Sequence, residues 1–297
     1  MDVHLRDLRY LVAVAEELHF TRAAERLHIS QPALSKQIRA LERGLGLSLL
    51  DRDHRSVSLT AAGEELVGAA RDLLVAWDGA LQRARRRAGE AAAVLRVGFH
   101  TSVAGHLYRD AAAAFSAAHP GWHVALRLHH WSDASAGLAE GSSDVAFLWL
   151  PVPEQEMLGW RVLRTERRSV ALWAGHPLEA KSAVSMGDLL DQPFVALPPE
   201  AGVLRDYWLA LDERGGHPVH VGAQADSPDA AFEAVAAGQG VALLAEGNAE
   251  LYARPGIVAR PVVDLDPCEL AIAWREGDER GVIGAFVEAA LEAGRGR

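Results

Sequence analysis

The chain has 297 residues, of which 49% are hydrophobic, so it is long and apolar enough for one small and one large folded domain. Its formal net charge of −10 argues against a generic polyanion binder, and its single cysteine excludes an internal disulfide. Charged residues or histidine interrupt every apolar run, and the N-terminus lacks the apolar core of a signal peptide. We therefore expect a cytoplasmic protein with no membrane partner.

The charge is unevenly distributed along the chain. Residues 1–90 contain 14 Lys and Arg against 13 Asp and Glu, whereas residues 91–297 contain 16 against 27. Within the first part, residues 21–55 hold seven basic and four acidic side chains. Because salt screens charges beyond about 10 Å, this local excess matters more than the total. The N-terminal part is therefore the candidate for contact with an anionic partner.

Three short helices are predicted at the N-terminus. Apolar residues recur at helical spacing from about Leu5 to Leu18. Thr21 is a candidate N-cap for a second helix over residues 22–27. Ser30 is a candidate N-cap for a third helix, with Pro32 in its first turn. Two helices joined by a short turn make a helix-turn-helix.

The third helix has a polar face that favours DNA as the partner. Gln31, Ser35 and Arg39 lie on this face at i, i+4 and i+8, with Lys36 beside them. A major-groove helix needs short polar groups, amides for adenine edges and cations for guanine or phosphate. An ordinary solvated helix face is the alternative, and the preceding helix and turn shift the balance towards DNA.

Residues 49–59 predict a β-hairpin beside this helix, because two apolar segments flank a charged tip. Arg52 and Arg55 would lie at or near that tip. In a winged helix-turn-helix, such arginines reach a phosphate or a narrow minor groove. The alternative is a surface turn whose arginines serve solubility.

A long helix follows, capped by Thr60 and reaching about Ala88. Its apolar residues step by three and four, as in a heptad seam that pairs two copies. The alternative is a helix packed on its own body. The seam predicted for dimerisation comprises Val67, Ala70, Leu74, Trp77 and Leu81.

From Val94 the pattern alternates between strands and helices, which is typical of a parallel α/β unit. The first unit is predicted to contain strands over 95–99, 124–128 and 145–148, with helices over 108–119 and 132–140. A second unit is predicted from about residue 163. It contains strands over 170–173, 194–197, 219–221 and 241–244, and a helix from Ser227; a strand over 269–274 and a helix from about Arg280 close the chain.

The run from Phe20 to Glu42 resembles the signature of LysR-type transcriptional regulators. The run reads Phe-Thr-Arg-Ala-Ala-Glu-Arg-Leu-His-Ile-Ser-Gln-Pro-Ala-Leu-Ser-Lys-Gln-Ile-Arg-Ala-Leu-Glu. The similarity continues, without gaps and then in weaker motifs, through Leu45-Gly46, Gly63, Gly98-Phe99, His119-Pro120 and His176-Pro177-Leu178. It therefore covers nearly the whole chain.

The resemblance implies an α/β fold in three parts. These are a winged helix-turn-helix DNA-binding domain over residues 1–59, a linker (dimerisation) helix over 60–90, and an effector-binding domain over 91–297. The last would be a two-subdomain, periplasmic-binding-protein-like (type 2) domain. Subdomain I would hold residues 91–162 and 267–297, and subdomain II residues 163–266. In this family the linker helices form a homodimer, and two dimers usually form a homotetramer.

By the same resemblance, DNA contacts fall on the third helix and the hairpin. The positions are Gln31, Pro32, Ser35, Lys36 and Arg55, with Thr21 and Ser30 near phosphates. A two-fold symmetric protein calls for an inverted-repeat operator in double-stranded DNA. RNA polymerase is a further implied partner.

The effector cleft is expected where strands end at their carboxyl side. This rule selects His100, Thr101, Ser102, Trp131, Ser132 and Trp149 from subdomain I, and Leu197, Pro198, Asp226 and Ser227 from subdomain II. Hydroxyls at a helix start suit an anion, and tryptophans suit a planar ring, so we expect an anionic or aromatic effector. Alternatively, Trp131 and Trp149 fill the subdomain interface, and Thr101 and Ser102 cap a helix.

Two other classes of protein fit the body less well. An enzyme with a Ser-His-Asp site would need a glycine-flanked nucleophile, and Ser102 has no glycines in register. His129 and His130 are adjacent on a strand and face opposite sides, so they cannot share a metal. A transport-type solute-binding protein would leave the N-terminal domain unexplained. We therefore expect no catalytic residues, no cofactor and no metal.

Overall fold

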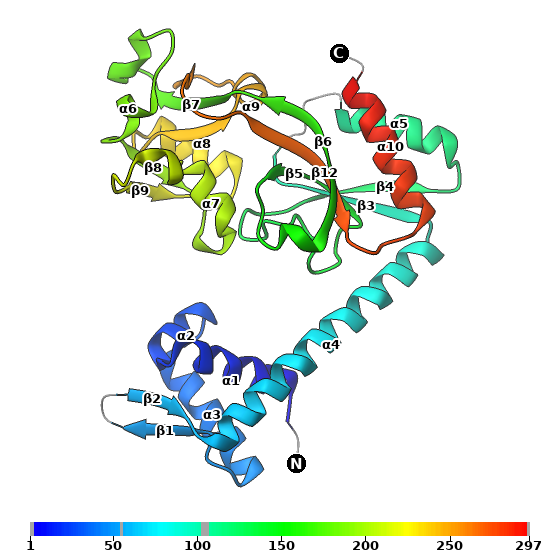
Figure 1. Ribbon diagram of the computed structural model, residues 1–297, viewed down its shortest axis with the longest axis vertical. Helices are drawn as coiled ribbons and strands as arrows, with labels where there is room; N and C mark the ends of the chain where they lie inside the picture. The colour runs from blue at the N-terminus through cyan, green and yellow to red at the C-terminus, as the bar shows by residue number, and fades with distance from the viewer. Residues whose placement is uncertain (1–2, 54–55, 102–106, 296–297) are drawn as a thin grey trace. The chain divides into compact units, whose positions relative to one another are not determined.

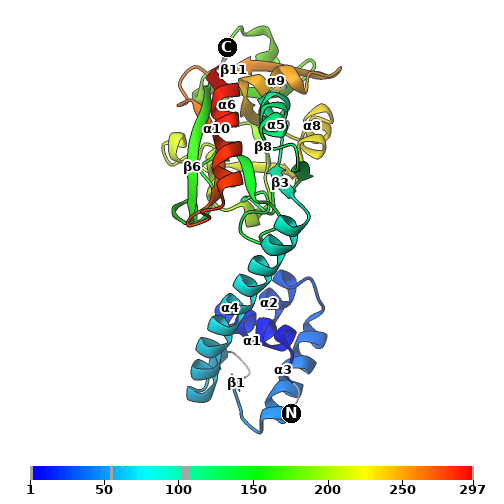
Figure 2. The same cartoon turned by 90° about the vertical axis from the view of Figure 1, so that its right-hand side faces the viewer.

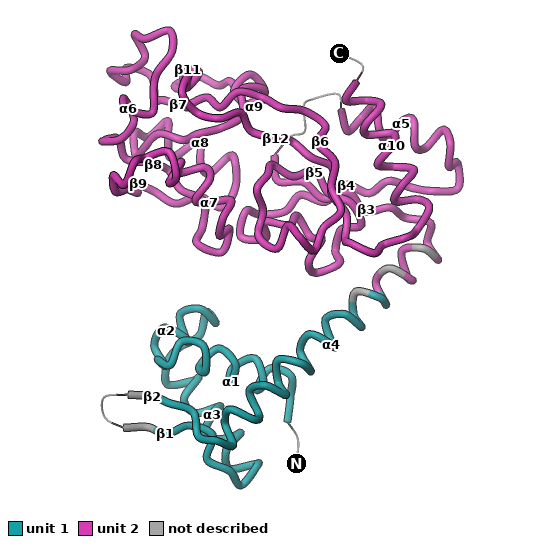
Figure 3. The backbone as a smooth tube through the Cα atoms, in the orientation of Figure 1, with its two compact units in different colours: residues 1–84 teal, residues 85–297 magenta. Residues whose placement is uncertain are grey.

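The computed structural model describes residues 3–53, 56–101 and 107–295, and the chain divides into two compact units (Figure 3). The first unit, residues 1–84, is called the head below, and the second, residues 85–297, is called the body. The long helix α4 begins in the head and ends in the body, so both units are continuous with one helical segment.

The head is a three-helix domain with a hairpin, as predicted. Its elements are α1 (Leu5–Glu17), α2 (Phe20–Arg26), α3 (Gln31–Leu45), β1 (Leu50–Asp53), β2 (Ser56–Leu59) and the first part of α4 (Ala61–Ala91) (Figure 1). β1 and β2 pair antiparallel, with Leu50 opposite Leu59. Glu42 Oε1 accepts hydrogen bonds from the N–H groups of Leu49 and Leu50 at 3.0 and 3.2 Å. This carboxylate ties the end of α3 to the start of the hairpin.

The N-caps of the second and third helices differ in part from the prediction. α2 begins at Phe20, and its cap is the ring of His19, whose Nδ1 accepts from the N–H groups of Thr21 and Arg22 at 3.2 and 3.4 Å. Thr21 therefore lies within the first turn, and its prediction as N-cap is wrong. Ser30 does precede α3, but its side chain makes no capping hydrogen bond.

The first turns of α4 belong to the head. Thr60 Oγ1 accepts from the N–H of Gly63 at 3.0 Å, which confirms the predicted cap. Val67 and Ala70 are 2% and 0% exposed in this single chain, and Val67 packs into the core of the head. The prediction that these two residues belong to a dimer seam is therefore wrong, because this part of α4 covers its own domain.

Subdomain I of the body is built on a five-stranded sheet of order β4-β3-β5-β12-β6. β3 runs parallel to β4 and β5, as predicted, while β12 is antiparallel to both β5 and β6. The elements are β3 (Val94–Phe99), α5 (Leu107–Ala118), β4 (His123–Leu128), β5 (Val145–Leu150), the 3-10 turn η1 (Gln155–Met157), β6 (Leu158–Glu166), β12 (Cys268–Arg275) and α10 (Gly281–Arg295).

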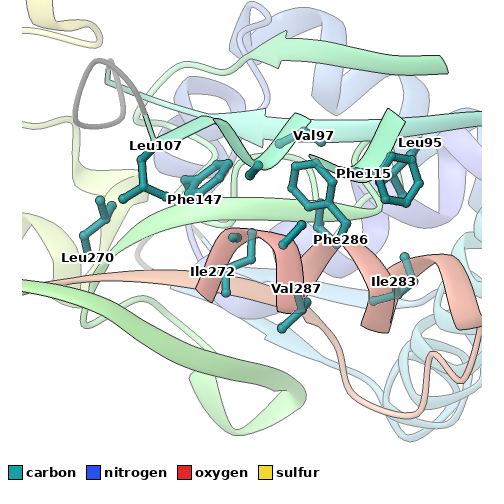
Figure 4. Close-up of a cluster of buried hydrophobic side chains, with 14 of the residues drawn as sticks. Leu95, Val97, Leu107, Phe115, Phe147, Leu270, Ile272, Ile283, Phe286 and Val287 are labelled. Carbon is teal, nitrogen blue, oxygen red and sulfur yellow. The ribbon is translucent and has the colours of Figure 1, made fainter. Parts of the chain in front are cut away.

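Two helices, α5 and α10, pack side by side against this sheet (Figures 1 and 2). Figure 4 shows the apolar side chains between them and the strands. Phe286 meets Phe115 and Phe147 edge to face, with ring centroids 5.6 and 6.4 Å apart. Aromatic pairs in this geometry add to the area they bury, so this cluster anchors the subdomain.

Subdomain II has a smaller mixed architecture. β7 lies between β10 and β11 and is antiparallel to both, and β8 pairs parallel with β9. The elements are β7 (Arg168–Trp173), η2 (Pro177–Ala180), α6 (Met186–Leu189), β8 (Pro193–Ala196), η3 (Pro199–Ala201), α7 (Val203–Trp208), η4 (Asp212–Arg214), β9 (His220–Gln224), α8 (Pro228–Ala236), β10 (Ala242–Ala245), α9 (Glu246–Leu251) and β11 (Ile257–Pro261).

Three predictions for the body need correction. Residues 132–140 form successive turns and no helix, because the Asp133 carboxylate accepts from the Ser135 hydroxyl and the Gly137 N–H, both at 2.7 Å. Strands β6 and β11 were not predicted. β6 also stays in the sheet of subdomain I as far as Glu166, beyond the expected boundary at 162.

Within the described residues, no helix has the length and apolarity needed to cross a membrane.

Candidate functional site

One face of α3 is exposed and polar. Gln31, Pro32, Lys36, Arg39 and Arg43 are all exposed, whereas Leu34 and Ile38 are fully buried. At about 100° per residue, the five exposed positions fall within roughly 140° of arc. Four of them were predicted, and Arg43 was missed, although its position continues the same face by one more turn.

The cations on this face have no acidic partner among the residues that the structure describes. Among the described residues, Lys36, Arg39 and Arg43 make no ion pair, whereas Arg22 and Arg26 of α2 lie 3.2 and 2.7 Å from Glu17 and Glu16. The same small domain thus neutralises the arginines of α2 and leaves those of α3 free. Unpaired, exposed cations on a helix are suited to phosphate oxygens and base edges.

The other five predicted DNA contacts differ in their exposure. Ser35 is only 9% exposed, so the expectation that it lies on the open polar face is wrong. It borders the apolar face of α3, where its small side chain is covered. Thr21 and Ser30 are both exposed. The hairpin is present, but Arg55 and the side chain of Arg52 lie outside the described residues.

The exposed part of α4 carries an apolar stripe. Trp77 and Leu81 are 48% and 38% exposed, and Leu74 is half-buried, so these three predicted seam residues are accessible. Leu73, at 56% exposure, adds to the stripe and was not predicted. A large exposed apolar stripe on a helix marks a surface for another chain.

The body contains a cavity between its two subdomains, with a volume of about 60 Å³. A water molecule needs about 10–15 Å³ by the same kind of measure, so the space suffices for several waters or a small organic group. The lining residues are Thr101, Trp131, Trp149, Val195, Ala196, Leu197, Trp208, Pro228, Ala231, Phe232, Ala242, Leu243, Leu244, Ala245, Asn248 and Tyr252.

Four of the predicted effector residues line this cavity, namely Thr101, Trp131, Trp149 and Leu197. Ser102 lies outside the described residues. The described part of the next helix, α5, begins at Leu107.

The other predicted effector residues that the structure describes do not line the cavity and make contacts with the protein itself. The Asp226 carboxylate accepts from the N–H and hydroxyl of Ser132 at 2.7 and 3.1 Å, which joins the two subdomains. Ser227 caps α8, accepting from the N–H of Ala230. Pro198 is buried and does not line the cavity. His100 is 5% exposed, and its Nε2 lies 2.7 Å from the carbonyl oxygen of Asp133.

Burial sets the protonation of two groups near this region. Desolvation is the main cause that lowers the pKa of His100, and it outweighs the nearby carboxylates. His100 is therefore neutral near pH 7. Desolvation likewise raises the pKa of the Cys268 thiol to about 12, so almost none of it is thiolate at neutral pH.

Sequence reasoning missed several lining residues. Trp208, Phe232 and Tyr252 come from helices or the residue after one, and no strand-end rule could select them. Asn248, in contrast, follows β10 by three residues, so the rule applied to β10 would have found it. Asn248 matters because it supplies one of the few polar groups in the cavity.

The polar groups of the cavity meet at Thr101. Trp149 Nε1–H and Asn248 Nδ2–H both donate to Thr101 Oγ1, at 3.2 and 3.4 Å. Trp149 also meets Trp208 edge to face, with centroids 6.3 Å apart. Residues from both subdomains therefore share one polar cluster and one aromatic pair. Among the described residues, no group of three His, Cys, Asp or Glu side chains could hold a metal.

Two family models match the chain. "Bacterial regulatory helix-turn-helix protein, lysR family" matches residues 5–64, and "LysR substrate binding domain" matches residues 88–295. The chain belongs to the LysR family of transcriptional regulators.

Full-length relatives agree with this assignment. The uncharacterized HTH-type transcriptional regulator YnfL of Escherichia coli (strain K12) is 40% identical over 217 residues, which cover 72% of each chain. The HTH-type transcriptional regulator BudR of Raoultella terrigena is 34% identical over 297 residues, covering 96% of this chain and 99% of BudR. Among solved structures, full-length OxyR from Pseudomonas aeruginosa, a cysteine-to-aspartate variant, has a TM-score of 0.53 and 28% identity, covering 99% and 100% of the chains.

The chain is therefore a DNA-binding transcription regulator of the LysR type, with an N-terminal helix-turn-helix domain and an effector-binding body. The predicted family and fold class are confirmed. Its relatives are transcription regulators, a family that is not enzymatic, so the enzyme alternative is excluded.

Proposed function

We propose that this regulator binds an inverted-repeat operator as a homodimer, with the exposed face of α3 in the major groove. The observation that carries the proposal is a set of three cations, Lys36, Arg39 and Arg43, which have no acidic partner in the described part of the chain and share a face with Gln31. Glutamine suits adenine edges, and arginine suits guanine edges or phosphates. Because the chain belongs to a family of bacterial transcription regulators, we propose that it acts in the cytoplasm, where the DNA lies.

Homodimerisation is supported by the apolar stripe on α4. Leu73, Trp77 and Leu81 are exposed in the single chain, and burying their surface in a second copy would stabilise the pair. If two copies pair along α4, a two-fold axis lies between the paired helices. This symmetry places the two heads on two half-sites, which accounts for an inverted repeat. Association of two dimers into a tetramer is the further expectation for this family.

We propose that the cavity between the subdomains is the effector site. Its lining comes from both subdomains, and Thr101 and Asn248 meet across it. A ligand there would change the free energy of closure, because it can favour one arrangement only through differential affinity. Asp226 and Ser132 then act as a clasp that holds the closed form rather than as ligand contacts.

A thiol-based redox signal is the second class of stimulus to consider for a relative of OxyR. The chain has one cysteine, so no intramolecular disulfide can form. Cys268 is fully buried, and burial raises the pKa of its thiol to about 12. Reactive sensor cysteines are accessible and have low pKa values. Binding of a small molecule is therefore the mode of sensing that these residues support.

The DNA-binding proposal is tested by selecting duplexes from a random-sequence pool with the full chain. We expect the recovered sequences to share an inverted repeat. With one selected duplex, Arg39→Ala and Lys36→Ala should each weaken binding, and loss of a phosphate contact should lower the slope of log affinity against log salt by about one.

The matched control is Arg22→Ala, since Arg22 is exposed but paired with Glu17. It should leave affinity and salt slope close to those of the unaltered chain. The proposal fails if all three variants behave alike, or if no sequence is enriched in the selection.

A further inference from the structure

The described residues that line the cavity carry no formal charge. They are aliphatic or aromatic apart from Thr101 and Asn248, with Tyr252 and the indole N–H groups as the other polar points. None of the described lining residues supplies the positive charge that a buried anion needs.

Charged and titratable groups near the lining do not change this conclusion. His100 is neutral because burial lowers its pKa. Arg205, the cation beside Leu197, donates to the backbone carbonyl of Leu197 and does not line the cavity. Asp226 contacts the lining residue Trp131: the backbone carbonyl of Asp226 accepts from the N–H of Trp131 at 3.1 Å. Arg254 lies 5.3 Å from the ring centroid of the lining residue Phe232, but it is paired with Asp229 and Glu233 at 2.9 and 3.1 Å.

The polar cluster has a defined hydrogen-bonding capacity. Thr101 Oγ1 accepts from Trp149 Nε1–H and Asn248 Nδ2–H, so both of its lone pairs are used. Its own O–H hydrogen must then be donated elsewhere. Asn248 Oδ1 receives no hydrogen bond from the described residues. One donor and one acceptor thus remain side by side, a pattern that a hydroxyl or amide group satisfies and a carboxylate, which only accepts, does not.

We propose that the effector is an uncharged, mainly apolar small molecule whose single hydroxyl or amide group binds Thr101 and Asn248. The apolar remainder of the ligand packs between Trp131, Trp149 and Trp208. This inference rests on the proposed role of the cavity as effector site, and of the anionic and aromatic effectors expected from the sequence it argues against the anionic one.

Matched pairs of compounds test the charge of the ligand. Benzamide and benzoate, and isobutyramide and isobutyrate, differ mainly in charge and hydrogen-bond donors. Titration calorimetry with the full chain should show each amide binding at least tenfold more tightly than its carboxylate. Thr101→Val, which keeps the shape and removes the hydroxyl, should weaken amide binding about tenfold. The control Thr165→Val, on the exposed side of β6, should leave it unchanged.

A second arm needs no ligand. Asn248→Asp introduces a carboxylate at the polar cluster, and Asn248→Leu removes the same amide without a charge. If the cavity disfavours anions, burial raises the pKa of the new carboxyl group in Asn248→Asp above that in the unfolded chain, so this variant should melt progressively lower than Asn248→Leu as the pH rises from 5 to 8. The other titratable groups nearby are present in both variants: Glu246 and Glu250 are exposed on the same helix, Glu166 of β6 accepts from the N–H of Gly247 at 2.8 Å, and His100 is buried next to Thr101.

The inference is wrong if a carboxylate binds as tightly as its amide, if neither amide binds, or if the two Asn248 variants keep a constant difference in melting temperature. A separate measurement tests the proposed effector site. Should the amides bind as expected but leave affinity for the selected duplex unchanged, the cavity has the inferred chemistry but is not the regulatory site.

Discussion

Replacing Gly63 with alanine should destabilise the head. Gly63 lies in the first turn of α4, and a Cβ added there would be 2.0 Å from the carbonyl oxygen of Leu49 and 3.2 Å from Leu59 Cδ2. A carbon that contacts a carbonyl oxygen normally stays about 3.3 Å or more away, so helix and strand must separate by about 1 Å. The Leu49 oxygen also accepts from the Thr60 N–H at 3.0 Å, and the same shift would strain that bond.

The size of the effect follows from three contributions. Overpacking a well-packed contact costs about 1–3 kcal/mol, and a weakened hydrogen bond adds about 1 kcal/mol. Alanine in place of glycine within a helix stabilises the helix by about 1 kcal/mol. The net loss is therefore about 2 kcal/mol, which corresponds to roughly 10 °C for a domain of this size.

Gly68 provides the matched control, because it lies on the same helix and a Cβ there would meet nothing within 4 Å. Gly68→Ala should be neutral or stabilise the head by about 0.5–1 kcal/mol. Thermal unfolding of the full chain by circular dichroism, with binding to a selected duplex as a second readout, compares the two variants. If Gly63→Ala melts at or above the temperature of Gly68→Ala, the close approach to Leu49 does not limit the head.

Two further predictions concern association and acid stability. Trp77→Asp should place a charge in the proposed dimer contact and give smaller species in sedimentation, whereas Val75→Asp, about 160° around the helix, should not; equal effects would place the contact elsewhere. Burial acts to raise the pKa of Asp144, but hydrogen bonds and charge from Arg96 and Arg280 outweigh it, and the net shift is downward. Asp144→Asn should therefore cost about 3 kcal/mol in urea unfolding at pH 7. That deficit should narrow as the pH falls below about 4 and the native carboxylate is protonated; a deficit independent of pH would contradict the pairing.

Much of the head was predictable because its determinants are local. The order of helices and hairpin follows from apolar spacing, Pro32 and the charged tip between two apolar segments in residues 49–59. The errors there are also informative. His19 caps α2 through its ring nitrogen, which no common capping preference would select. Ser35 was predicted to lie on the open face because helical periodicity gives the angle of a residue around the axis. Periodicity does not show whether neighbouring side chains cover that residue.

The body shows where local patterns fail. Residues 132–140 have helical composition, but the Asp133 carboxylate satisfies the N–H of Gly137 and holds a series of turns instead. β6 has no clear alternation, and its strand conformation depends on pairing with β12. A strand that is stabilised mainly by its partner cannot be recognised from its own residues.

By itself, the sequence determined the family, the helix-turn-helix head, the alternating body and four of the cavity residues, because these depend on spacing within single elements. Only the tertiary structure decided which of these residues are exposed and therefore accessible to a partner. It buried Val67 and Ala70 in the head, left Trp77 exposed, and assigned Asp226 to the clasp. It also brought Asn248 to Thr101 from 147 positions away. Exposure and long-range contact depend on how elements pack, and no local pattern records that packing.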